Sequence, residues 1–160
     1  GGWGVAAAGA GVFLNNGMMW FDPRPGRLNS VAGGKRTLTA MSPLVLCRDG
    51  KPVLAVGGSG GRKILTAVAQ VVGHVVDRGL GPQAAIEIPR VHCEGTDTLV
   101  DDRAAPEAIA ALRRLGHRVK LMTESPIHVN FALPNAIAIG DDGLLRGGVD
   151  PLRPGTAKGV

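Results

Sequence analysis

The chain has 160 residues, enough for one domain that buries roughly two-thirds of its extended surface. A hydrophobic share of 44% with 19% charged residues excludes an intrinsically disordered chain. The net charge of +5 favours anionic partners, but the cations are scattered, without a basic arm or interleaved aromatic residues, so we expect no nucleic-acid partner. Apolar stretches are broken within about ten residues, and we expect no membrane span.

The N-terminal part combines a short apolar run with a long irregular stretch. Residues 11–16 predict a short buried strand that ends in an Asn pair. Residues 17–41 are rich in Gly and Pro and show no period, which indicates a long ordered loop. Loops of this length in compact domains are usually functional.

A hairpin and a helix follow the loop. Two β-rich runs, at about 43–48 and 52–57, flank the pair Asp49-Gly50, which is a strong hairpin signal. Apolar residues then recur at helical spacing over 61–77, and Gly79 is expected to stop this helix. Its apolar stripe is wide and almost uncharged, so the helix should be largely buried.

The remainder alternates between helices and extended segments. In chain order the predicted elements are a short helix within 81–90 that has Pro82 in its first turn, an extended segment at 90–95, an edge strand at 96–102, an amphipathic helix at 105–117, a strand at 118–122 and a hairpin at 135–151. Strands and helices grouped in this way predict an α+β fold, a sheet layered with helices, in a single domain over 1–160.

Two isolated cysteines, Cys47 and Cys93, lie in strand-like apolar runs. They provide neither a disulfide framework nor a metal-ligand spacing, and we expect reduced thiols in the core. Two cysteines do not decide whether the protein resides in the cytoplasm or is periplasmic or secreted. No cofactor or metal is expected from the motifs.

The stretch "VGGSGGRKIL" at 56–65 places Gly60 and Gly61 between a strand and a helix. The first amides of a helix lack internal acceptors and form its positive end, so an anion is favoured there. A phosphate loop would need Gly-Lys-Ser/Thr, and a dinucleotide loop would need a further Gly three residues on; both are missing. A structural turn, nucleotide binding and an oxyanion hole for acyl transfer remain as interpretations.

Other polar residues give weaker signals. His92 and Glu94 should share a strand face, but a zinc site would need further ligands, and a satisfied strand is the preferred interpretation. His74 is expected in the core with a backbone or carboxylate partner. The hydroxyls of Thr37, Thr39 and Ser42 would act as nucleophiles only beside a base, and none lies in a nucleophile elbow.

Four segments occur in the order and spacing of one known family: "GVFLNNGMMWFDPRPG", "GGKRTLTAMSPLVL" continuing through "RDGKPVLAVGGSGGRKI", "DRGLGPQAAIEIPRVH" and "GGVDPLRPGTAKG". Together they cover nearly the whole chain, which resembles the C-terminal part of the small subunit of γ-glutamyltranspeptidases, a family of N-terminal nucleophile hydrolases. The resemblance implies part of a four-layer αββα sandwich and an enzyme that cleaves amides by acyl transfer. In this family a new N-terminal Thr is the nucleophile, and its own amino group is the base.

The resemblance also implies roles for particular residues. The oxyanion-hole amides fall on Gly60 and Gly61, and the hydroxyl pair that binds a substrate carboxylate falls on Thr39 and Ala40. The acidic cluster that binds a substrate α-ammonium falls on the segment from Gly17 to Trp20. Ala40 lacks a hydroxyl and that segment lacks a carboxylate, so we expect a substrate other than glutathione, such as a glutaryl-type or other amide.

The chain begins at Gly1, which is not a nucleophile, and the resemblance places the catalytic Thr outside it. By itself the chain is therefore expected to have no catalytic activity. Its expected partners are a small-molecule amide, and either the rest of the enzyme (large subunit and nucleophile segment) or another copy of itself. Two alternatives remain: a non-catalytic remnant that binds or supports other chains, and an anion- or nucleotide-binding module.

Overall fold

The computed structural model describes residues 2, 4–152 and 155–158. The chain divides into two compact units, Gly1–Thr39 and Ala40–Val160, and each is described by itself. The single domain expected over 1–160 stays a proposal. Among the described residues, no helix combines the length and apolar character that crossing a bilayer would require.

The first unit is mostly irregular. Its described residues contain one short 3-10 helix, η1 (Gly17–Trp20), and two isolated β-bridges, one of which joins Ala6 to Phe13. The prediction of a buried strand at 11–16 is wrong, because only that bridge forms and the Phe13 side chain is 75% exposed. Gly9 and Gly11 have positive φ and turn the chain sharply, which leaves no room for a longer ladder.

The second unit is built on an antiparallel sheet in the order β1-β2-β6-β7. Its strands are β1 (Leu44–Arg48), β2 (Lys51–Ser59), β6 (Leu133–Ile139) and β7 (Leu145–Val149). Asp49 and Gly50 both have positive φ, as a two-residue hairpin loop of type I′ requires. Both predicted hairpins, β1-β2 and β6-β7, are therefore confirmed.

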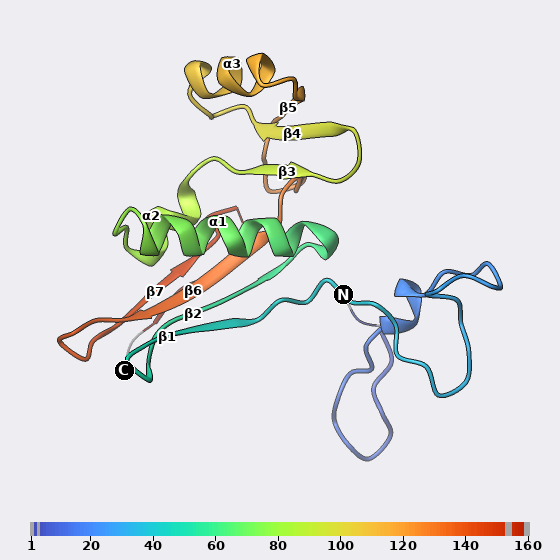
Figure 1. The fold of residues 1–160 in the computed structure, drawn as a ribbon. Helices are drawn as coiled ribbons and strands as arrows, with labels where there is room; N and C mark the ends of the chain where they lie inside the picture. The colour runs from blue at the N-terminus through green and yellow to red at the C-terminus, as the bar shows by residue number, and fades with distance from the viewer. Residues whose placement is uncertain (1, 3, 153–154, 159–160) are drawn as a thin grey trace. The chain divides into compact units, whose positions relative to one another are not determined.

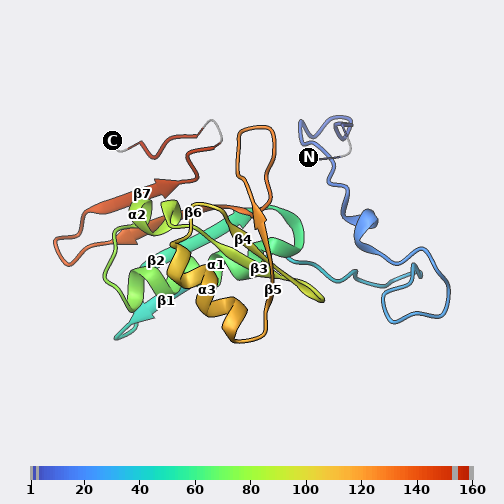
Figure 2. The same ribbon diagram turned by 90° about the horizontal axis from the view of Figure 1, so that it is seen from above.

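Helices cover one face of this sheet (Figures 1 and 2). They are η2 (Gly61–Lys63), which runs directly into α1 (Ile64–Val76), and α2 (Pro82–Glu87). The predicted helices are confirmed, and Gly79 beyond α1 has φ 66°, as a helix stop requires. The core between helices and sheet consists of Leu54, Val56, Ile64, Ala67, Val68, Val71, Ala85, Ile86, Ala132 and Ala136.

A smaller sheet has the order β3-β4-β5. It comprises β3 (Val91–Cys93), β4 (Asp97–Asp101) and β5 (Arg118–Met122), and α3 (Pro106–Arg114) connects the last two strands. The prediction that residues 96–102 form an edge strand is wrong. The crossover through α3 returns the chain parallel to β4, on the side opposite to β3, so β4 lies in the middle.

The second face of the four-stranded sheet is apolar and exposed. Val45, Ala55 and Ile137 lie opposite one another across three strands, and Val45 is 64% and Ile137 49% exposed. Cys47 on β1 and Cys93 on β3 are both free and exposed, so the expectation of core thiols is wrong about their burial. In a strand that is covered on one face only, every second side chain points away from the core, and this accounts for exposed cysteines on strands. The predicted α+β fold class is confirmed.

Candidate functional site

The glycine turn joins β2 to the helical segment. Gly60 has φ 140° and Gly61 φ 63°, conformations that residues with a Cβ rarely adopt. A Cβ built on Gly60 would lie 2.7 Å from the Cα of Ala132, a backbone atom that cannot swing away. Glycine is therefore required at position 60 both by φ and by the close approach of β6.

The turn opens the helical segment at the surface without an acidic residue. The first helical turn contains no acidic residue and includes Arg62 and Lys63. Its leading amides have no acceptor within the helix, and Gly60 is exposed, so an anion can reach this end. Arg62 forms an ion pair with Glu94, which lowers the pKa of that carboxyl group.

His92 connects β3 to the start of α1. Thr66 Oγ1 donates to the Lys63 carbonyl at 3.0 Å and also contacts Nδ1 of His92 at 2.9 Å. The other ring nitrogen lies 3.6 Å from Glu94, so the two side chains are close, but Glu94 follows the end of β3 and is not on the strand face where it was expected. The set has the composition of a hydroxyl, imidazole and carboxylate triad. However, the Thr66 proton already points at a carbonyl, so this hydroxyl is not poised as a nucleophile.

His74 lies on α1 and is half-buried, less enclosed than the expected core position. Burial lowers the pKa of His74, and the nearby Arg78 lowers it further. Its backbone carbonyl accepts from the Leu80 amide at 3.2 Å, which closes the end of the helix. Among the described residues, no group of three or more His, Cys, Asp or Glu side chains is arranged to hold a metal ion.

In the first unit, Gly17 and Trp20 are the two ends of η1. Met18 and Met19 between them are 66% and 70% exposed and border an open hollow of 580 Å³ together with Leu14, Asn15 and Asn16. The carboxylate next along the chain, Asp22, is bound by Arg24 at 3.1 Å and Arg27 at 3.7 Å, and Arg24 lowers its pKa. The hollow is thus bordered by three apolar side chains and two asparagines, and the carboxylate beside η1 is already paired with arginines.

Thr39 and Ala40 lie on either side of the boundary between the units. Thr39 is exposed and Ala40 is half-buried, while the Thr37 hydroxyl donates to the Leu38 carbonyl at 3.0 Å. Of the predicted site residues, Gly60 and Gly61 share one turn, and Gly17 and Trp20 share one short helix. Their roles remain predictions.

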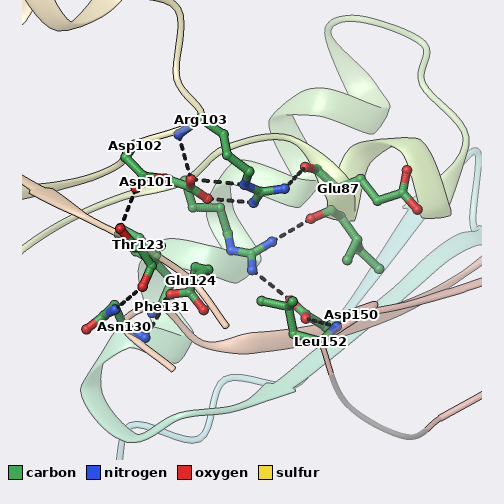
Figure 3. Close-up of polar contacts among 12 residues, drawn as sticks. Glu87, Asp101, Asp102, Arg103, Thr123, Glu124, Asn130, Phe131, Asp150 and Leu152 are labelled. Atoms are coloured by element: carbon green, nitrogen blue, oxygen red, sulfur yellow. Dashed lines mark hydrogen bonds and ion pairs between the residues drawn. The ribbon is translucent and has the colours of Figure 1, made fainter. Parts of the chain in front are cut away.

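A buried polar cluster that the sequence reasoning missed joins the two sheets (Figure 3). Arg90, just before β3, donates to Asp150 at 2.7 Å and to the Ile86 carbonyl at 2.5 Å. Asp101, at the end of β4, has no exposed surface and is paired with Arg103 at 2.6 Å. No local pattern signals the Arg90–Asp150 pair, because its members are 60 positions apart, whereas Asp101 and Arg103 are only two positions apart.

Glu124 belongs to the same region (Figure 3). One of its oxygens, Oε1, accepts from the amides of Asn130 at 2.7 Å and Phe131 at 2.6 Å. Its other oxygen, Oε2, is closed off from solvent without a hydrogen-bond partner among the described residues. Burial raises the pKa of Glu124; the two amides and Arg90 oppose this shift, and Asp101 adds to it.

Comparison with known proteins places this arrangement in a family. The family model described as Gamma-glutamyltranspeptidase matches residues 1–160. The acylase ACY 1 proenzyme of Pseudomonas sp. (strain SE83) is 40% identical over 144 residues, which cover 89% of this chain and 25% of the relative. The glutathione hydrolase proenzyme of Bacillus subtilis (strain 168) is 32% identical over 161 residues, covering 99% of this chain and 27% of the relative.

Solved structures agree with the sequence relatives. Cephalosporin acylase from Bacillus halodurans matches with a TM-score of 0.79 and 29% identity, covering 94% of this chain and 28% of that one. A γ-glutamyltranspeptidase from Pseudomonas nitroreducens, complexed with L-DON, matches with a TM-score of 0.78 and 29% identity, covering 99% and 87%.

The chain thus spans about a quarter of the length of the curated relatives, 25% and 27% for the two named here. The helix layer on a sheet layer in this chain is part of the α+β sandwich of N-terminal nucleophile hydrolases, as predicted. A family model that matches over the whole chain, relatives that cover nearly all of it and structures of the same fold lead to one conclusion: the chain belongs to the γ-glutamyltranspeptidase family.

Proposed function

We propose that this chain forms the oxyanion-hole part of an enzyme that cleaves amides and transfers the acyl group to water or an amine. The nucleophile in this proposal is a Thr that lies outside the chain. The observation that carries the proposal is the glycine turn, in which two consecutive residues with positive φ open a helix whose first turn bears no acid.

The proposed chemistry follows from this geometry. When the Thr oxygen attacks the amide carbon, the carbonyl oxygen takes up negative charge. The N–H groups of Gly60 and Gly61 would donate to that oxygen, in a turn that tolerates no side chain at position 60. Donors already fixed by the fold stabilise the developing charge without rearrangement, and removing one such donor from an enzyme lowers kcat by roughly 10²–10³-fold.

The acyl group we propose carries no free α-ammonium. Gly17, Met18, Met19 and Trp20 contain no carboxylate, and Asp22 is held by two arginines. An ammonium buried beside such a surface would lack a counter-ion, which is unfavourable. A glutaryl-type acyl chain, or another chain without an α-ammonium, needs no such counter-ion, and one of the relatives is named an acylase.

The proposed partner is the remainder of the enzyme, which would supply the nucleophile and the second sheet of the sandwich. The uncovered face around Val45, Ala55 and Ile137 supports this partner, because a sheet face with that much apolar surface is stable only when another layer covers it.

The test is an acyl-transfer assay on the protein as its gene encodes it, with glutaryl and γ-glutamyl anilides as donors. We expect an acyl-enzyme by intact mass and a higher kcat/KM for the glutaryl donor. Trp20→Asp, which supplies a carboxylate on η1, should shift the preference toward the γ-glutamyl donor, and Phe21→Leu is the matched control. A protein that contains an N-terminal Thr yet forms no acyl-enzyme would contradict the proposal.

A further inference from the structure

We propose that Glu124 is a positioning residue for the glycine turn: its carboxylate holds the segment at 130–132 against which Gly60 is packed. This inference rests on the proposed function of that turn. It assigns Glu124 no contact with substrate. Three consecutive contacts link Glu124 to the turn, and backbone atoms take part in each of them.

The first contact is the clamp itself. Oε1 of Glu124 accepts from two consecutive amides, those of Asn130 and Phe131, at 2.7 and 2.6 Å. Consecutive amides that converge on one anionic oxygen form a nest, a common way for a backbone to bind an anion. The Asn130 side chain donates to the Thr123 carbonyl at 2.7 Å, so both ends of the loop between β5 and β6 are tied together.

The second contact carries the constraint into the core. Phe131 is 2% exposed and Ala132 is fully buried, so close packing restricts the movement of both residues. Leu133 then pairs with Ser59, the last residue of β2 before the glycine turn. The clamp therefore determines where β6 begins relative to the end of β2.

The third contact reaches the turn. A Cβ on Gly60 would lie 2.7 Å from Ala132 Cα and 2.8 Å from Ala132 Cβ, so Gly60 and Ala132 are in direct backbone contact. A shift of Ala132 would change the direction of the Gly60 and Gly61 amides. Displacing a catalytic group by about 1 Å can lower a rate by about 100-fold.

Groups from several elements face Glu124. Arg90, before β3, and Asp101, at the end of β4, act on its carboxyl group in opposite senses, and burial favours its neutral form. A neutral side chain with a carbonyl oxygen in the place of Oε1 would still accept from both amides. Glu124→Gln should therefore preserve the clamp, whereas Glu124→Ala should remove it.

The experiment compares Glu124→Ala, Glu124→Gln and the control Glu107→Ala, which removes an exposed carboxylate on α3, in the protein as its gene encodes it. We expect Glu124→Ala to lower kcat by roughly 10–100-fold with KM within about threefold of the parent value. Glu124→Gln and Glu107→Ala should stay within about threefold in both constants. A Glu124→Ala protein with the parent kcat would overturn the inference.

Hydrogen exchange of the peptide that contains Gly60 and Gly61 tests the clamp independently of whether the protein transfers an acyl group. We expect faster exchange in Glu124→Ala alone, even if the parent protein transfers no acyl group; unchanged exchange would refute the clamp whatever the activity. If Glu124→Ala does not fold, Glu124→Asp replaces it. Its side chain is shorter by one methylene and should not reach both amides, so parent-like kcat and exchange in this variant would also refute the clamp.

Discussion

Arg90 and Asp150 form an ion pair at 2.7 Å although they are 60 positions apart, and both side chains are almost fully buried. Arg90 leads into the small sheet, and Asp150 directly follows β7 of the large sheet. The Arg90 guanidinium also donates to the Ile86 carbonyl beside the end of α2. One side chain thus links both sheets and a helix of the second unit.

Removing one partner of this pair should destabilise the protein strongly. Asp150→Asn leaves the Arg90 charge buried without its counter-ion, and we expect the free energy of unfolding to fall by about 3–5 kcal/mol. The control is Arg118→Ala, which removes the exposed pair with Asp97 and should cost about 0–1 kcal/mol. Urea denaturation measures both values. Equal falls in the free energy of unfolding would show that the buried pair contributes no more to stability than the exposed pair.

Gly60→Ala should strongly reduce acyl transfer. We expect the loss to come from displacement of the glycine turn and not only from backbone strain at the substituted residue. The new methyl group would meet Ala132 at a φ of 140°, so the turn must move, and we expect kcat to fall by about 10²-fold or more. Gly79→Ala is the matched control because Gly79 also has positive φ but faces open space. It should lose about 1–2 kcal/mol of stability with kcat unchanged. A similar kcat loss in both variants would argue against the oxyanion role.

The raised pKa of Glu124 predicts how stability depends on pH. Burial raises its pKa above that of an exposed glutamate, so folding favours the protonated group. The stability that Glu124 contributes is full below the unfolded pKa and is lost as pH rises through the folded pKa. Glu124→Gln should therefore stabilise the protein more at about pH 7 than at about pH 4. Thermal melts at both values test this, with exposed Glu107→Gln expected to show no such trend.

The uncovered sheet face predicts association. Expressed alone, the chain should self-associate, since Val45 on β1 and Ile137 on β6 present exposed apolar side chains on either side of β2. Ile137→Glu should make the lone chain more soluble and should prevent assembly in the complete gene product. Leu115→Glu, at an exposed position after α3, is the control and should change neither property. Light scattering measures both; a monodisperse, cooperatively melting lone chain would contradict this view.

Ala40→Ser should improve the binding of acyl donors that end in a carboxylate. The new hydroxyl restores the pair with Thr39 that the family resemblance implies. Because a hydrogen bond to a charged group contributes about 1.5–3 kcal/mol, KM for a glutaryl donor should fall by about tenfold or more. Thr37→Ala, which removes a hydroxyl bonded to the Leu38 carbonyl, should leave KM unchanged. An unchanged KM in Ala40→Ser would remove this position from the proposed substrate site.

Local chemistry made much of the fold predictable. The turn at Asp49 and Gly50, the apolar period of α1 and Pro82 in the first turn of α2 each depend only on residues close by in the sequence. The misjudged elements depend on distant segments. Phe13 is exposed because no ladder forms beyond one bridge, and β4 is central because α3 carries the chain to its other side.

The same division holds at the candidate site. That a glycine turn opens a helix at residues 60 and 61 could be predicted, because φ preference and helix periodicity are properties of neighbouring residues. The contact of Ala132 with Gly60 and the hydrogen bonds of Glu124 to the segment beside it became known from the three-dimensional structure. Those contacts join residues far apart in the chain, and only the pairing of β2 with β6 brings them together.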